Sequence, residues 1–153
     1  MEWMILPFKR YADFQGRSRR MEYWMFALLN IIVAIVLMTP FIIGLAGTAA
    51  LDPAAVDVDP LGAVGTFGMI GLGVYGLYAL AVLIPSIAVV VRRLHDRDMS
   101  GWWYLGAAVA SIIPLVGFIA SIAFLVIMFL PGTAGPNRFG PDPKDPHNSE
   151  VFT

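Results

Sequence analysis

The sequence contains no cysteine. This absence excludes disulfide bonds, thiolate metal ligands and a cysteine nucleophile. Charged residues are also scarce, at 14% of the chain, whereas an ordinary soluble domain has about 25%. The net charge at neutral pH is −1, so the charge balance gives no indication of nucleic-acid binding. No pattern in the chain points to a metal or an organic cofactor, and none is expected.

The few charges are unevenly placed. None occurs in residues 23–51, 60–91 or 99–137. A bilayer core of roughly 30 Å needs about 20 apolar residues in a helix, and each of these stretches is long enough. Since 58% of the chain is apolar, too little polar sequence remains to cover three buried elements of a soluble fold. The pattern therefore predicts an all-α membrane protein.

The three uncharged stretches predict three transmembrane helices, at roughly 19–47, 66–93 and 102–130. The first is too long for the apolar part of a signal peptide, which spans about 7 to 15 residues, and a retained helix is the favoured interpretation. Its lone amide, Asn30, is expected to form a hydrogen bond with a neighbouring helix. Pro114 lies within the third stretch. One helix kinked at Pro114 is favoured there, and a hairpin that turns at this proline is the alternative.

The two ends of the chain are more polar than its middle. Residues 1–17 alternate aromatic and basic side chains, which predicts a segment lying in the headgroup layer. Residues 1–143 are predicted to form a single integral membrane domain. Residues 144–153 are predicted to form a flexible C-terminal tail.

Basic residues predict the orientation. The leader holds five and the loop between the second and third helices holds three, whereas the first loop, 48–65, holds none. Because Lys and Arg mark the cytoplasmic side, the N-terminus is expected in the cytoplasm. The side of the tail depends on whether 102–130 is a single helix or a hairpin, and the sequence leaves this open.

Three polar motifs flank the apolar stretches, in the order GRSRRMEYW (16–24), RRLHDRDMSGWW (92–103) and GPNRFG (135–140). Together they resemble the motifs of the bacterial inner-membrane family known as domain of unknown function 805. The resemblance covers nearly the whole chain. It implies a multi-pass protein of the bacterial inner (plasma) membrane, and it implies no particular activity.

The motifs supply the candidate binding residues. Converging arginines beside an interfacial segment suit anionic lipid phosphates or an acidic membrane-protein partner, and homo-oligomer contacts are a further option. The candidates for lipid or partner binding are Arg17, Arg19, Arg20, Glu22, Arg92, Arg93, His95, Asp96, Ser100, Trp102, Trp103, Asn137, Arg138 and Phe139. The favoured function is a non-catalytic accessory or scaffold protein that binds at the cytoplasmic face.

Two other functions compete with this one. An oligomeric pore or transporter for a small solute is the main alternative, although no charged side chain lies in the middle of a predicted span. An enzyme would need His95 and Asp96 as a base and its orienting carboxylate. An ion pair between Asp96 and Arg92 or Arg93 explains that carboxylate more simply, and no catalytic residue is assigned.

Overall fold

The structure, a computed structural model, describes residues 2–51 and 60–145. Residues 52–59 of the predicted loop, 48–65, and most of the predicted flexible tail, 144–153, therefore lie outside the described residues. The chain forms two compact units. One, the two-helix unit, is Ala27–Leu83; the other, the terminal unit, consists of Met1–Phe26 and Ile84–Thr153.

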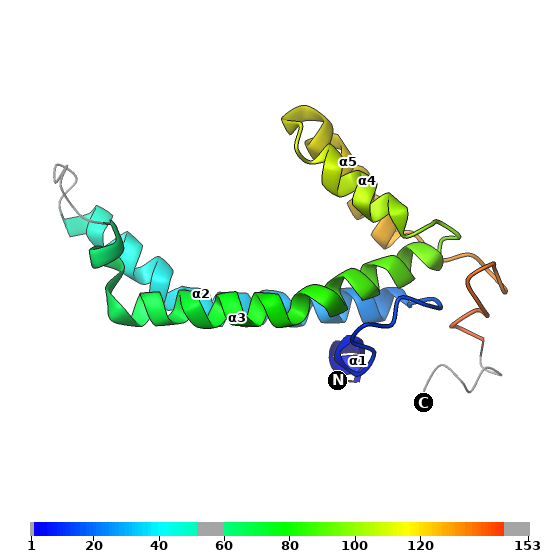
Figure 1. The fold of residues 1–153 in the computed structure, drawn as a ribbon, viewed down its shortest axis with the longest axis horizontal. Helices are drawn as coiled ribbons and strands as arrows, with labels where there is room; N and C mark the ends of the chain where they lie inside the picture. Colours follow the sequence, from blue (N-terminus) through cyan, green and yellow to red (C-terminus); the bar gives the residue numbers. More distant parts are fainter. Residues whose placement is uncertain (1, 52–59, 146–153) are drawn as a thin grey trace. The chain divides into compact units, whose positions relative to one another are not determined.

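The described residues form helices, together with one isolated bridge between Asn137 and Gly140. The prediction of an all-helical chain is confirmed over this part of the sequence. The helices are α1 (Glu2–Lys9), α2 (Arg20–Leu51), α3 (Pro60–His95), α4 (Trp102–Ala110) and α5 (Pro114–Phe129) (Figure 1).

Two of these helices are long and apolar enough to cross a membrane. The qualifying parts are Arg20–Gly47, with 28 residues, and Val64–His95, with 32. At 1.5 Å per residue they reach about 42 and 48 Å, more than the roughly 30 Å of a bilayer core. Gly65 has a non-helical backbone (φ 67°, ψ 171°), so α3 is broken there and continues as regular helix from the next residue.

In the two-helix unit, α2 and α3 pack as an antiparallel pair with a regular register. The hydroxyl of Tyr78 donates a 2.9 Å hydrogen bond to Oδ1 of Asn30, which confirms the expected partner on a neighbouring helix. Seven residues further along α2, Leu37 lies against Gly71, and after another seven Gly44 lies against Val64. The contacting residues on α3, Tyr78, Gly71 and Val64, are also seven residues apart but run in the opposite direction along the chain. This heptad spacing keeps the contacts on one stripe of each helix.

The region 102–130 is not one kinked helix; that prediction was wrong. It forms two packed helices, α4 and α5, which lie side by side in Figure 1. Ile113 is extended (φ −95°, ψ 113°), because the α conformation is disfavoured before a proline, and Pro114 then occupies the first turn of α5. Gly117 permits the tight turn, since a Cβ there would lie 2.7 Å from the Cα of Ser111.

The hairpin is apolar on its outer surface and short. The exposed fractions of Ile112, Leu115 and Phe118 are 78%, 72% and 66%. With 9 and 16 residues, α4 and α5 are about 14 and 24 Å long, so neither reaches across a bilayer core of roughly 30 Å. The exposed apolar tip nevertheless needs an apolar environment.

Aromatic contacts hold the start of α2 within the terminal unit. The ring of Phe26 meets that of Phe8 edge-on, with 5.3 Å between centroids. Trp24 stacks on Phe129, the last residue of α5, at 4.1 Å. These contacts bring α1 and the end of the hairpin to the first turns of α2.

The close approach of α2 and α3 generates a prediction with a matched control. Gly71→Ala places a Cβ 2.7 Å from the carbonyl oxygen of Leu37, whereas a Cβ at Gly76 meets no atom within 4 Å. Gly71→Ala should lower the free energy of unfolding. Overpacking costs about 1 to 3 kcal/mol, and the higher helix propensity of alanine offsets about 1 kcal/mol of that cost. Gly76→Ala should be neutral or stabilising. Thermal unfolding in detergent measures both, and equal melting temperatures would contradict the packing described for this pair.

Candidate functional site

The start of α2 and the leader just before it meet the end of α3, about 70 to 80 residues further along the sequence. The last turn of α3 supplies Arg92 and Arg93, and Asp96 follows it directly. The first turn of α2 supplies Glu22, and the leader supplies Arg17. These five residues are called the arginine–carboxylate cluster. Adjacent residues on a helix point about 100° apart, so Arg92 and Arg93 reach different partners.

The ion pairs of the cluster are direct and buried. Nη2 of Arg92 lies 2.8 Å from Oε1 of Glu22. Asp96 bridges two arginines, with Oδ1 3.0 Å from Nη2 of Arg17 and Oδ2 against Nη1 of Arg93. No side chain of the five is more than 3% exposed. Charges removed from water to this degree must be paired and hydrogen-bonded, because their desolvation costs several kcal/mol each.

The arginines outnumber the carboxylates, and main-chain carbonyls accept further hydrogen bonds from all three, although Nε of Arg92 has no partner among the described residues. Arg17 donates to the carbonyl oxygens of Gly135 and Thr133, each at 2.6 Å. Arg92 donates to those of Arg10 and Asp13, and Arg93 to those of Met128 and Leu130. The cluster therefore fastens the leader and the segment after α5 to the end of α3.

The segment after α5 crosses directly over the carboxylate of Asp96. A Cβ at Gly132 would overlap Oδ2 of Asp96, so only glycine fits there. The backbone N–H of Thr133 donates to the carbonyl of Asp96 at 2.8 Å, and that of Ser18 donates to the carbonyl of Arg92 at 3.1 Å. Gly132 and Ser18 leave no side-chain signal in the sequence, because their role lies in the backbone. Thr133 also uses its hydroxyl, which accepts from Arg17 at 3.2 Å and from Nδ2 of Asn137 at 3.1 Å, but a lone threonine in a loop does not indicate these distant partners.

The third motif docks on the turn that follows α3. The ring of Phe139 stacks on that of His95, with centroids 3.9 Å apart and planes at 4°. Nδ2 of Asn137 donates to the carbonyl of His95 at 2.9 Å, and Nδ1 of His95 lies 3.2 Å from the carbonyl oxygen of Gly16. His95 thus joins all three motifs. It forms no hydrogen bond with Asp96, whose oxygens face arginines instead.

The other predicted residues lie around the cluster. Arg19 donates to the carbonyl of Pro143 and lies 5.6 Å above the ring of Trp3. Arg20 is exposed and donates to the carbonyl of Phe129 at 3.2 Å. Arg138 pairs with Asp98 at 3.1 Å on the surface.

The remaining predicted residues lie at the start of the hairpin: Ser100, Trp102 and Trp103. Oγ of Ser100 accepts a hydrogen bond from the backbone N–H of Trp102 at 3.4 Å. The exposed fractions of Trp102 and Trp103 are 76% and 62%, so the two indoles lie outside the cluster. An amphipathic indole at the polar end of an apolar hairpin suits a membrane–water interface.

Two carboxylates outside the helices shape the local turns. The pKa of Asp13 is lowered: slight burial raises it, but the 2.7 Å bond from Arg10 and the backbone N–H of Gln15 outweigh that effect. The pKa of Asp142 is also lowered, chiefly by the backbone N–H of Lys144. Within the described ranges, 2–51 and 60–145, no group of three His, Asp or Glu side chains could hold a metal ion.

The fold and the site define a class of protein: an all-helical chain with two candidate membrane spans, a shorter apolar hairpin and a buried ionic cluster beside them. The chain belongs to the family described as protein of unknown function (DUF805), whose profile matches residues 11–141. This membership confirms the family indicated by the three sequence motifs.

Two relatives from Escherichia coli (strain K12) match almost end to end. The chain is 40% identical over 144 residues to inner membrane protein YhaH, covering 94% of this chain and 98% of the relative. It is 37% identical over 145 residues to inner membrane protein YhaI, covering 94% and 97%. No solved structure matches the chain significantly.

The shared carboxylate of Asp96 generates a prediction. Asp96→Asn removes the charge that Arg17 and Arg93 share, and should lower the free energy of unfolding by about 3 to 5 kcal/mol because buried guanidinium groups are left uncompensated. Asp98→Asn is the matched control, since its pair with Arg138 is 48% and 59% exposed and contributes only about 0 to 1 kcal/mol. Thermal unfolding in detergent compares them. Equal stability of the two variants would show that the cluster does not hold the terminal unit together.

Proposed function

We propose that this chain is a non-catalytic accessory or scaffold protein of the bacterial inner membrane that binds anionic lipid headgroups at its cytoplasmic face. The two long helices cross the bilayer, and the hairpin of α4 and α5 enters it from the cytoplasmic side and returns. Two spans and a re-entrant hairpin thus replace the three spans expected from the sequence. Both termini then lie in the cytoplasm.

The distribution of basic residues supports this orientation. All ten Lys and Arg residues lie in the sequence of the terminal unit, and none lies in Ala27–Leu83. Because Lys and Arg accumulate on the cytoplasmic side of inner-membrane proteins, the terminal unit belongs there. The hairpin agrees with this orientation, because both of its ends lie at the end of α3. The first arm, α4, follows α3 directly, and the carbonyls at the end of α5 bind Arg93.

The observation that carries lipid binding is the division of the arginines into two sets. Arg17, Arg92 and Arg93 are buried and committed to the cluster. Arg20 and Arg97 each donate to one main-chain carbonyl near the end of α5, and neither pairs with a carboxylate of the described chain. Their positive charge is therefore uncompensated at the level where headgroup phosphates lie. Arginine suits this role, because its planar fork binds phosphate oxygens in pairs.

The hydrogen bonds and ion pairs already made by Asp96 and His95 support a non-catalytic role. Both oxygens of Asp96 bind arginines, and His95 is stacked on one face and hydrogen-bonded at Nδ1. These groups act in holding segments together. The rigid cluster then serves as a platform that presents the peripheral arginines and the exposed indoles to the membrane surface.

The topology can be tested with single cysteines, because the chain has none of its own. A cysteine at Ala54, between the two candidate spans in the sequence, should react with an impermeant thiol reagent added to the periplasm. Cysteines at Asp98 and Lys144 should stay protected until lysis. Labelling of Lys144→Cys from the periplasm would place the third apolar region across the bilayer and refute the re-entrant hairpin.

The headgroup proposal predicts the effect of removing the uncompensated arginines. Arg20→Gln with Arg97→Gln should weaken retention of phosphatidylglycerol at least about tenfold, since each lost charge-assisted hydrogen bond costs roughly 1.5 to 3 kcal/mol. Native mass spectrometry counts the bound lipid, and melting temperatures in nanodiscs of phosphatidylglycerol and of phosphatidylcholine report its stabilising effect.

The matched control removes the same charge from paired arginines. Arg10 pairs with Asp13 and Arg138 with Asp98, so Arg10→Gln with Arg138→Gln should leave lipid retention nearly unchanged. Equal retention by both double variants and the unaltered protein would refute headgroup binding. Retention of a co-purifying protein in place of lipid, lost in the first variant alone, would assign the same arginines to an acidic membrane-protein partner.

A further inference from the structure

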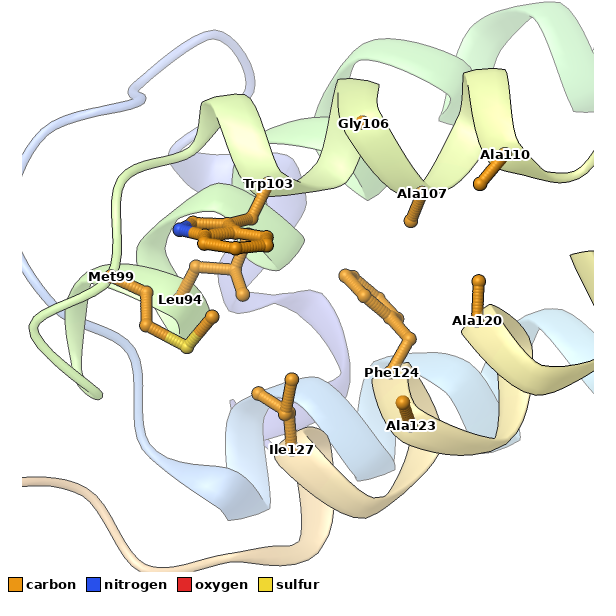
Figure 2. Close-up of a pocket in the computed structure, with 10 residues that line it drawn as sticks. All are labelled: Leu94, Met99, Trp103, Gly106, Ala107, Ala110, Ala120, Ala123, Phe124 and Ile127. Atoms are coloured by element: carbon orange, nitrogen blue, oxygen red, sulfur yellow. The ribbon is translucent and has the colours of Figure 1, made fainter. Parts of the chain in front are cut away.

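A cavity of about 240 Å³ lies between the two arms of the hairpin. Figure 2 shows side chains of both helices pointing toward the gap, with Leu94 and Met99 at one end of it. The facing residues are mostly small: Gly106, Ala107 and Ala110 on α4, and Ala120, Ala123 and Phe124 on α5. This cavity is called the hairpin slot. From Trp103 to Ala110 it follows eight residues of α4, a rise of about 10 Å.

The small side chains do not fill the slot, and a bulky pair keeps the arms apart. The rings of Tyr104 and Phe124 are in contact across the hairpin, with centroids 6.0 Å apart. A Cβ at Gly106 would meet no atom within 4 Å, so the slot is open along α4. Protein interiors are otherwise close-packed, and an empty space of this kind loses the contacts that its walls could make.

The chemistry of the walls selects an apolar occupant. The residues that line the slot are Gly, Ala, Leu, Ile, Met, Phe and Trp. Water needs two to four polar partners to settle in a cavity, and these side chains offer almost none. The outer faces of the same hairpin are exposed and apolar, as at Leu115 and Phe118, so the surrounding medium consists of lipid chains.

Arg97 lies next to one end of the slot in the sequence, between the lining residues Leu94 and Met99. Arg97 belongs to the turn in which its own N–H and that of Met99 donate to the carbonyl of Leu94, at 2.9 and 3.0 Å. Its Nη1 donates to the carbonyl of Pro131, just after α5, at 2.7 Å, so the side chain bridges the two ends of the hairpin. Nε of Arg97 is buried and has no hydrogen-bond partner among the described residues. The buried Nε is closed to a ligand, whereas the Nη end of the guanidinium is exposed and can bind a phosphate through charge-assisted hydrogen bonds.

We infer that the hairpin slot holds one acyl chain of an anionic phospholipid whose phosphate binds Arg97. This inference rests on the proposed function and makes it specific, because it places one lipid molecule at one site. A single phospholipid satisfies both requirements, since its chain fills the carbon-lined slot and its phosphate meets the exposed Nη end of Arg97, in the turn between Leu94 and Met99.

The first experiment fills the slot. Gly106→Phe projects a ring into it, and Gly76→Phe is the matched control, because a Cβ at either glycine meets no atom within 4 Å. In detergent with added phosphatidylglycerol, native mass spectrometry should find one tightly retained lipid in the unaltered protein and in Gly76→Phe. Retention should fall about tenfold or more in Gly106→Phe. Phosphatidylcholine of the same chains and chainless glycerol phosphate should each bind more weakly than phosphatidylglycerol.

The second experiment leaves the slot intact. Trp103 lines it, so a variant with Trp3, Trp24 and Trp102 changed to Phe reports on the slot by fluorescence. Phosphatidylglycerol with brominated chains should quench this indole and saturate near one lipid per chain, and brominated phosphatidylcholine should not saturate there.

Unsaturable quenching, or full lipid retention by Gly106→Phe, would overturn the inference. A loss of retention on removal of Arg20 and Arg97, with none in Gly106→Phe, would then still support headgroup binding without a chain in the slot. If instead glycerol phosphate binds as tightly as the lipid, the site recognises the phosphate group alone.

Discussion

The terminal unit depends on the need to pair buried guanidinium charges. Arg17, Arg92 and Arg93 have almost no contact with water, and only two carboxylates face them. Further hydrogen bonds from these arginines go to main-chain carbonyls of the leader and of the segment after α5. The need to pair the arginines at the end of α3 therefore determines the backbone path of the leader and of the segment after α5. The side chain of Asp96 is central, because it serves two arginines at once.

The hairpin follows from the same constraint. Pro114 permits either a kink or a turn, and the local sequence does not choose between them. The carbonyls of Met128 and Leu130 bind Arg93, so α5 must end where α3 ends. With both of its ends held there, the apolar stretch has to turn back on itself. The short arms and the slot between them are consequences of this return.

The two units rely on different forces. In the two-helix unit, close backbone contact at Gly44 and Gly71 and one hydrogen bond between Tyr78 and Asn30 hold α2 to α3. In lipid, where apolar burial gives little driving force between helices, such packing and polar contacts are the available means. The terminal unit instead uses ion pairs, carbonyl acceptors and ring stacking. The buried arginines are thus structural, whereas anion binding by the surface arginines belongs to the function proposed above.

The sequence by itself determined the helical class, the two long apolar helices, the family and the grouping of polar residues into three motifs, because these depend on composition and local spacing. It also indicated two kinds of contact. Arg93 is close enough in sequence to pair with Asp96, and a lone amide in an apolar helix, Asn30, needs a partner on a neighbouring helix. Tertiary structure alone decided that 102–130 is a hairpin, which arginines are buried, and that Gly132 lies over Asp96. Those features are set by contacts between residues about 35 to 120 positions apart, and no local pattern records where a distant carbonyl will lie.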